Sequence, residues 1–161
     1  MTDKDILDLL RKDGRLDAAE IARMFDSAPE EVSKRVADME SDGVIIGYQA
    51  IVDESKAPDA KVKAIIEVKI RPSGLEGFDG VAMRLAKFAE VETLYLVSGE
   101  YDLELEVHGA SLGDVAAFVS SKLATTEGVE ASATRFILKK YKESNRMLGG
   151  GDDSGRLKVS P

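Results

Sequence analysis

A short run of polar and basic residues, Ser33-Lys34-Arg35, lies inside a stretch that has the apolar spacing of a helix. Lysine and arginine side chains bind phosphate oxygens and base edges, and serine hydroxyls bind the DNA backbone. On an ordinary surface helix such a cluster is a solvated face, and Arg35 has Glu31 and Asp38 at helical spacing as ion-pair partners. Within a helix-turn-helix we favour DNA contact, with the structural ion pair as the alternative.

A second group of residues lies in the turn between two alternating, strand-like stretches. Backbone amides beside Gly99 can bind a carboxylate, and the carboxylate of Asp102 can pair with an ammonium group. Together these groups recognise both charged ends of a free amino acid, and hydroxyls two residues apart on a later strand can add hydrogen bonds. The alternative is a turn that only packs an interface and holds no ligand. The candidate effector residues are Ser98, Gly99, Tyr101, Asp102, Ser132 and Thr134.

The residue types that serve most enzymes and metal sites are scarce among the 161 residues. There is no cysteine, which excludes disulfides, cysteine nucleophiles and thiolate zinc sites. His108 is the single histidine, so one chain lacks the ligands for a histidine metal site and is poorly equipped for a Ser-His-Asp triad. Gly149–Gly151 lacks the lysine and helix of a phosphate-binding loop. We therefore expect no enzyme, no metal and no cofactor.

The hydropathy of the sequence predicts a folded protein without a membrane-spanning segment. Hydrophobic residues make up 43% of the chain and charged residues 32%, enough to bury a core. No apolar run approaches the roughly 18–20 residues of a membrane span, and residues 1–5 do not resemble a signal peptide. We expect a cytoplasmic protein.

Charge is distributed unevenly along the chain. The net charge is −8, and residues 1–60 hold 8 basic against 15 acidic side chains. An acidic half repels DNA at long range, so affinity requires local basic clusters or several dimers bound together. Arg15, with Arg11, Lys12 and Arg23 near it in sequence, is positioned to contact phosphates.

The first 45 residues predict three short helices. Thr2 begins a capping box, and Asp17 is the expected cap of the second helix. Pro29 opens the third helix, with Asp26 or Ser27 as its expected cap. Three helices joined by tight turns indicate a helix-turn-helix.

The rest of the chain predicts a mixed domain. Residues 47–52 read as a strand and residues 53–60 as a polar linker, after which apolar and polar residues alternate from Val62. The pattern that follows is strand-helix-strand-strand-helix-strand, a ferredoxin-like arrangement with strands one and three central and helices on one face. Its last strand is expected to run from Val129 to about Tyr141, and a second subunit is expected to cover the open face.

This order of parts resembles the Lrp/AsnC (feast/famine) transcription regulators over about residues 2–148. No single stretch is diagnostic, but several matching stretches occur in the right order. They are Lys12–Arg15, Glu20–Ala22, Val32–Val36, Met39–Glu40, Gly43–Tyr48, Val97–Asp102, Glu127–Val129 with Ser132 and Thr134, and Lys142–Arg146.

The resemblance implies an α+β protein with a three-helix, winged-type helix-turn-helix and a ferredoxin-like βαββαβ domain called RAM. It also implies a homodimer that binds double-stranded DNA and assembles into tetramers, octamers or larger discs. A small effector, usually an amino acid, binds between dimers and changes assembly or DNA affinity. The expected segments are residues 1–47 (helix-turn-helix), 48–60 (linking strand and linker), 61–148 (RAM) and 149–161 (flexible tail).

Two departures from the family pattern affect the third helix. Asp26-Ser27-Ala28 replaces the usual Gly-Leu-Ser, and Glu30 and Glu31 occupy the first turn. Acids there stabilise a helix by about 0.3–1 kcal/mol through the helix dipole, or one can accept a hydrogen bond from a cytosine amino group. The candidate DNA-binding residues are Glu30, Glu31, Ser33, Lys34, Arg35 and Arg15. The alternative function is a RAM-type amino-acid-sensing or assembly protein with little DNA binding.

Overall fold

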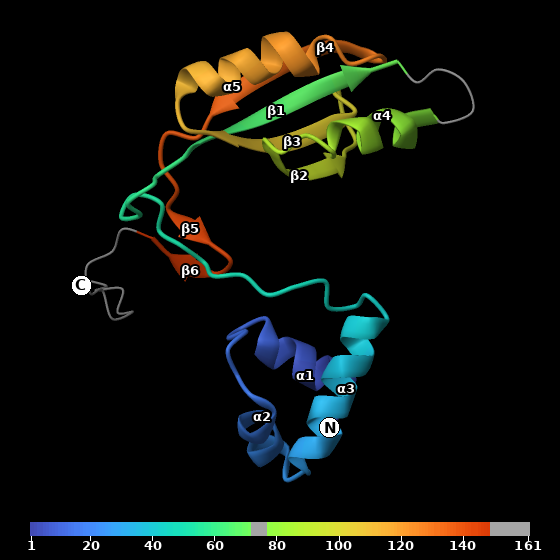
Figure 1. Cartoon of the computed structure of the whole chain (residues 1–161), viewed down its shortest axis with the longest axis vertical. Helices are drawn as coiled ribbons and strands as arrows, with labels where there is room; N and C mark the ends of the chain where they lie inside the picture. Colours follow the sequence, from blue (N-terminus) through green and yellow to red (C-terminus); the bar gives the residue numbers. More distant parts are fainter. Residues whose placement is uncertain (72–76, 149–161) are drawn as a thin grey trace, which may run out of the picture. The chain divides into compact units, whose positions relative to one another are not determined.

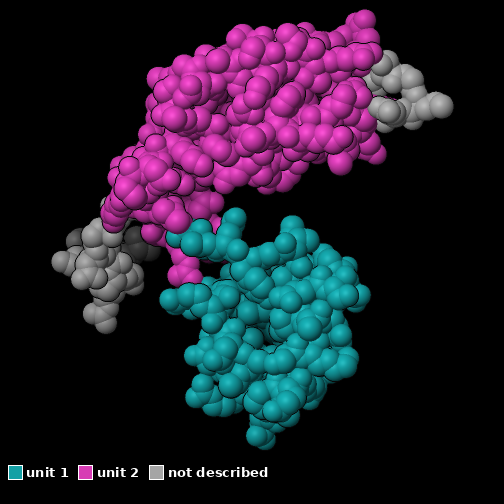
Figure 2. All heavy atoms as spheres, in the orientation of Figure 1, with its two compact units in different colours: residues 1–51 teal, residues 52–161 magenta. Residues whose placement is uncertain are grey.

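The three predicted helices form the first unit of the chain, residues 1–51 (Figure 1). They are α1 (Asp3–Leu10), α2 (Ala18–Phe25) and α3 (Pro29–Ser41) in the computed structural model, which describes residues 1–71 and 77–148. Residues 52–161 form the second unit, shown in a different colour in Figure 2. In the described part of the chain no helix is long and apolar enough to cross a membrane.

Local side-chain hydrogen bonds determine where the first two helices begin. The Thr2 hydroxyl accepts from the Asp5 amide at 3.3 Å, and the Asp5 carboxylate accepts from the Thr2 amide at 2.7 Å. Asp17 and Glu20 form the same reciprocal pair at the start of α2, with distances of 2.7 and 3.0 Å. Both expected caps are therefore confirmed.

The expected cap of α3 is wrong. The N-cap residue is Ala28, which offers no side-chain acceptor. Asp26 is instead the last residue of the α2 turn, with a left-handed φ of 50°, and the Ser27 amide donates to the Ala22 carbonyl. Both residues are thus used to end α2, so α3 begins without a side-chain cap, and Pro29 together with the acids Glu30 and Glu31 favours its first turn.

The small core of unit 1 collects one face of each helix. Ile6 of α1, Ile21 and Ala22 of α2, and Val32 and Met39 of α3 are buried. These five side chains hold three short helices together, because helices of 8 to 13 residues are marginal without tertiary packing.

The strand expected over residues 47–52 is absent, and residues 1–61 form no strand in the structure. After α3, Gly43 takes a left-handed φ of 72°, and the amides of Val44 and Ile45 both donate to the Met39 carbonyl. A strand requires a neighbour for its backbone groups, and a single chain supplies none for this segment.

The second unit is built on a four-stranded antiparallel sheet (Figure 1). Its strand order, β2-β3-β1-β4, puts the first and third strands in the centre as expected for the ferredoxin-like fold, which is confirmed. The elements are β1 (Val62–Ile70), α4 (Gly77–Leu85), β2 (Val91–Leu96), β3 (Leu103–Gly109), α5 (Leu112–Phe118), a π-helical turn η2 (Val119–Leu123) and β4 (Val129–Phe136).

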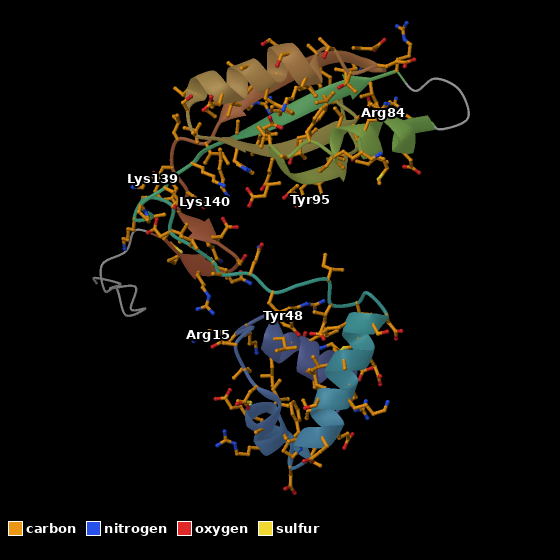
Figure 3. All side chains as sticks on the ribbon, viewed as in Figure 1. Arg15, Tyr48, Arg84, Tyr95, Lys139 and Lys140 are labelled. Carbon is orange, nitrogen blue, oxygen red and sulfur yellow. The ribbon has the colours of Figure 1, made fainter. Side chains whose placement is uncertain are left out.

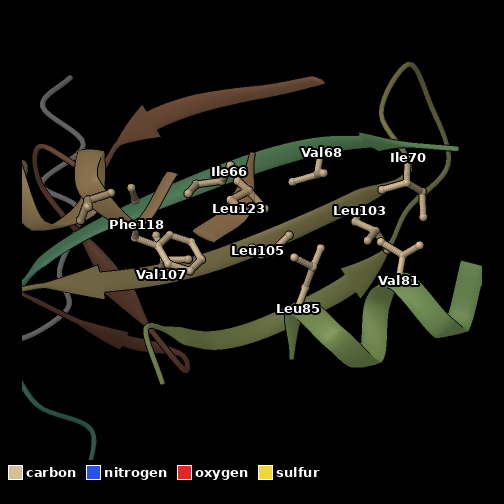
Figure 4. Close-up of a cluster of buried hydrophobic side chains, with 12 residues drawn as sticks. Ile66, Val68, Ile70, Val81, Leu85, Leu103, Leu105, Val107, Phe118 and Leu123 are labelled. Atoms are coloured by element: carbon tan, nitrogen blue, oxygen red, sulfur yellow. The ribbon is translucent and has the colours of Figure 1, made fainter. Parts of the chain in front are cut away.

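Alternation along β1 and β3 divides the sheet into two faces. Ile66 and Val68 of β1 and Leu105 of β3 are fully buried beside Leu85 of α4 and Phe118 of α5 (Figure 4). The intervening residues, such as Glu67 and Glu104, lie on the opposite face and are half-buried. The helices of unit 2 therefore cover one face of the sheet, and no helix among the described residues of this unit covers the other.

The last strand is shorter than expected. β4 ends at Phe136, and the chain then forms a separate hairpin of β5 (Lys142–Glu143) and β6 (Arg146–Met147). The two turn residues, Ser144 and Asn145, have left-handed φ values of 42° and 66°, as a two-residue hairpin turn requires. The predicted break at residues 72–74 and the tail 149–161 lie outside the described residues.

Candidate nucleic-acid interface and effector site

The side chains of α3 separate into three stripes. Val32 and Met39 are buried against α1 and α2. Glu30 and Lys34 lie on the exposed side, away from the core, and Asp38 continues the stripe by helical spacing. This outward stripe is the face of α3 that is free to enter a DNA groove.

Ser33 lies on a different stripe from Lys34. Together with Val36, Ala37 and Glu40 it lines a hollow whose other wall comes from α1, α2 and Tyr48. The hollow belongs to the packing of unit 1. Ser33 is exposed at the edge of this hollow and lies beside the outward stripe.

The cation of the outward stripe is already paired. Lys34 Nζ lies 2.7 Å from an Asp38 carboxylate oxygen, one turn along the helix. Both side chains are exposed, so the pair contributes about 0–1 kcal/mol and can exchange for a phosphate or base at little cost. Lys34 remains the candidate donor on this face.

Arg35 connects two helices. Its guanidinium lies 2.9 Å from Asp3 of α1 and 3.1 Å from Glu31 of α3, and the Asp3 hydrogen bond followed by the Glu31 hydrogen bond raises the Arg35 pKa. The expected pairing with Glu31 is present, whereas Asp38 is taken by Lys34. Asp3 was not predicted, because it lies far from Arg35 in sequence and no local spacing indicates it.

Arg15 is held within the loop between α1 and α2. Its Nε and Nη2 atoms each lie 3.2 Å from an oxygen of Asp13, and the Asp13 hydrogen bonds raise the Arg15 pKa. The Arg15 side chain is highly exposed, and it lies on the loop between α1 and α2, away from α3 (Figure 3). It is available for a phosphate, but the pair with Asp13 must open first.

Tyr48 is a functional candidate that sequence reasoning missed. Its hydroxyl donates to Glu40 of α3 at 3.0 Å, and its ring lies 3.5 Å from the position of a Cβ atom built on Gly14. Partial burial, followed by the hydrogen bond to Glu40, raises the Tyr48 pKa. The contact holds the segment after α3 against the α1–α2 loop (Figure 3), and no local spacing in the sequence indicates it, because Gly14 and Tyr48 lie far apart in the chain.

The candidate effector turn links β2 to β3. Gly99 has a φ of 142°, a conformation that favours glycine, and lies exposed at the turn. The Asp102 carboxylate accepts from the Ile70 amide at 2.9 Å, and the Asp102 amide donates to the Val68 carbonyl at 3.1 Å. Asp102 therefore ties the turn to β1 through one carboxylate oxygen, and its other oxygen accepts no hydrogen bond from a described residue.

Within one chain the turn and the hydroxyl pair are not brought together. Val68 of β1 pairs with Leu103, next to Asp102, on one side and with Ser132 on the other. β1 thus separates the two groups by two strand spacings, roughly 10 Å. Ser132 and Thr134 also share the face of their partners Val68 and Ile66, which is the helix-covered face. A single site that uses both groups requires a second copy of the chain.

Comparisons with known proteins agree with this architecture. A winged helix-turn-helix DNA-binding model matches residues 2–46, and a model of the Lrp/AsnC ligand binding domain matches residues 63–147. Among the described residues no group of three or more acidic or histidine side chains can hold a metal ion.

The chain is similar to individual regulators over most of its length. It is 43% identical to the HTH-type transcriptional regulator YugG of Bacillus subtilis, over 100% of this chain and 99% of that protein. It is 26% identical to the leucine-responsive regulatory protein of Escherichia coli K12, covering 91% of this chain and 88% of that protein. A transcriptional regulator of Neisseria meningitidis solved with L-methionine superposes with a TM-score of 0.69 at 25% identity, covering 88% of this chain and 90% of that one. The chain belongs to the Lrp/AsnC family of helix-turn-helix transcriptional regulators.

Proposed function

We propose that this regulator reads DNA with the outward stripe of α3 and that a free amino acid bound at the Gly99–Asp102 turn changes its assembly. The observation that carries the proposal is that one chain holds both features. The third helix of unit 1 has an exposed polar face, and the Gly99 turn of unit 2 has a carboxylate oxygen of Asp102 that can accept from a ligand.

DNA reading follows from the position of the polar groups on α3. The first residues of a recognition helix contact base edges, and Glu30 and Lys34 lie there on the exposed side. A carboxylate accepts from the cytosine amino group, and a lysine donates to guanine or to phosphate. Glu31 and Arg35 are engaged with each other and with α1, so we assign them a supporting role in which they fix α3 in the unit.

A footprint on the DNA upstream of the gene tests this reading. We expect a pseudo-palindromic protected region with half-sites about 10 bp, or a multiple of it, apart. Lys34→Ala should weaken binding by about 1–3 kcal/mol if it contacts a base. Lys4→Ala is the matched control, because Lys4 forms the same exposed pair with an aspartate, Asp8, on α1. Equal losses for both variants, or no protected region, would reject the assignment.

The effector assignment rests on charge and geometry at the turn. The second Asp102 oxygen suits an ammonium group, and the amides near Gly99 suit a carboxylate. One regulator similar to this chain is named leucine-responsive and another is solved with L-methionine, which favours an apolar amino acid. Ser132 and Thr134 would join the site only from a second copy of the chain.

A thermal-shift screen of the twenty amino acids, with oligomer size measured in parallel, tests the effector site. Asp102→Asn is the sharpest variant, because an amide oxygen can still accept from the Ile70 amide while the negative charge is lost. We expect it to abolish the response with little effect on the fold. Glu100→Gln, which removes a charge from the same turn, should retain the response. If no amino acid moves either readout, the turn serves only packing.

Two features without a packing partner in a single chain support assembly as a homodimer, and from dimers to tetramers or octamers. The open sheet face carries half-buried residues with no layer over it. Residues 44–52 are rich in strand-forming side chains, yet Ile46 is 95% exposed and the segment has no strand partner in one chain. A second copy can supply both partners, and sedimentation velocity of the full chain measures the result. A protein that binds chromosomal DNA in this way works in the cytoplasm.

The second candidate, an assembly or amino-acid-sensing protein with little DNA binding, is favoured by the acidity of residues 1–60. An amino-acid response without any footprint would select it.

A further inference from the structure

Unit 1 has little positive charge that is free to meet DNA. Of its seven lysines and arginines, five are held in ion pairs with aspartate or glutamate, among them both cations of α3. Arg23, another of the seven, donates to the Ala19 carbonyl of its own helix at 3.2 Å. The paired cations are Lys4, Arg11, Arg15, Lys34 and Arg35. Because residues 1–51 hold 7 basic against 12 acidic side chains, a duplex held by this unit alone would meet net repulsion at long range.

The C-terminal hairpin has the opposite character. Residues 139–146 contain four cations and a single acid, Glu143, which is paired with Lys140. Lys139 lies over the Tyr141 ring, with its Nζ 4.9 Å from the ring centre. Lys139 and Lys142 are exposed, and neither forms an ion pair with any described residue.

The hairpin presents these charges on a short, ordered element. Lys142 of β5 lies opposite Met147, and Glu143 lies opposite Arg146 of β6. The Leu148 amide donates to the Tyr141 carbonyl at 2.9 Å, which closes the base of the hairpin. The exposed turn residues Ser144 and Asn145 add polar side chains that can donate to phosphate oxygens.

We propose that this hairpin is a second DNA contact, which binds the phosphate backbone without reading sequence. The inference rests on the proposed function, since it supplies the electrostatic part of a complex whose specific part comes from α3. The partner is a polyanion because the surface is cationic and polar at its tip, and because Lys139 and Lys142 form no ion pair with any described residue. DNA is the polyanion that a helix-turn-helix protein already has to hold.

The salt dependence of binding distinguishes such contacts. Each phosphate contact adds about 0.9 to the slope of log affinity against log salt concentration on duplex DNA. Loss of two contacts per protomer should therefore lower the slope by about 1.8 per protomer. A backbone contact should also weaken all duplexes by the same factor and leave the preference between sequences unchanged.

The experiment compares the full chain with Lys142→Gln, Lys139→Gln/Lys142→Gln and Lys87→Gln on upstream and random-sequence duplexes between 50 and 200 mM salt. Lys87 is the matched control, because it is exposed and forms no ion pair with any described residue. We expect a stepwise fall in slope for the single and double hairpin variants, an unchanged slope for Lys87→Gln, and unchanged melting temperatures. Hairpin variants that keep the wild-type slope, or a control that loses as much, overturn the proposal while leaving the proposed function intact. A wild-type chain that binds neither duplex overturns both.

Discussion

The two units of the chain use positive charge in different ways. In unit 1 most arginines and lysines are paired with nearby acids, and Arg35 also joins α3 to α1 through Asp3. In unit 2 a large apolar core holds the fold, and Lys139 and Lys142 of the hairpin are left without ion pairs among the described residues. In the proposed complex α3 supplies the specific contacts to DNA, and the hairpin supplies contacts to the phosphate backbone.

The largest expected effect is the loss of stability when a buried side chain is removed from the hydrophobic core of one unit. Leu105→Ala removes a fully buried side chain from the unit 2 core and should lower its free energy of unfolding by about 2–5 kcal/mol. Hydrogen exchange should show loss of protection in the sheet and none in α2 or α3. Ile21→Ala should produce the reverse pattern, because Ile21 belongs only to the unit 1 core. Loss of protection throughout the chain in either variant would show that the cores are not independent.

A smaller effect concerns the acid on the outward stripe of α3. Glu30→Gln removes a negative charge beside Lys34 and should raise affinity for random-sequence DNA by about 0.2–1 kcal/mol. If Glu30 also accepts from cytosine, the preference between sequences should fall in the same variant. Glu127→Gln changes an exposed acid of unit 2 and serves as the control. Unchanged binding to random DNA would place Glu30 away from the duplex.

An effect of similar size, here on the free energy of unfolding, concerns the start of α3, where the N-cap residue Ala28 makes no side-chain hydrogen bond. Ala28→Ser adds an acceptor for the free amides at the start of the helix and should stabilise unit 1 by about 0.5–1 kcal/mol. The reverse change at an existing cap, Asp17→Ala, should destabilise it by a similar amount. Urea unfolding followed by circular dichroism measures both. No gain for Ala28→Ser would mean that a side-chain acceptor at this position does not stabilise the first turn of α3.

The smallest effect is a pH dependence confined to α1. The Thr2 amide, and then its hydroxyl, donate to Asp5 and lower the pKa of that carboxyl. Since the folded pKa lies below the unfolded value of about 3.9, the contribution is present above that pH and is lost as pH falls through the folded pKa. Protection of α1 should therefore fall below about pH 4 in the wild type and less so in Asp5→Asn. Identical profiles would show that this carboxylate does not stabilise the helix.

Features set by neighbouring residues could be predicted from the sequence. The capping pairs Thr2 with Asp5 and Asp17 with Glu20 are three residues apart, and alternation from Val62 to Ile70 indicated which face of β1 is buried. Their causes are local hydrogen bonds and a two-residue repeat, both visible in a short window.

Features that depend on distant parts of the chain could not be predicted. Asp3 reaches Arg35 only through the packing of α1 on α3. Ser132 and Thr134 share a face as expected, but only the strand order and register show that it is the helix-covered face, across β1 from Asp102. The strand expected over residues 47–52 requires a partner that lies outside a single chain.

The most direct test of the central claim, that an acidic unit reads sequence while charge elsewhere supplies attraction, is one salt titration. The affinity of the full chain is measured by fluorescence anisotropy for its upstream DNA and for a shuffled duplex of equal length. The account predicts that both affinities fall as salt rises and that the upstream DNA is bound on the order of 10³-fold more tightly. Equal affinity for the two duplexes at every salt concentration would contradict it.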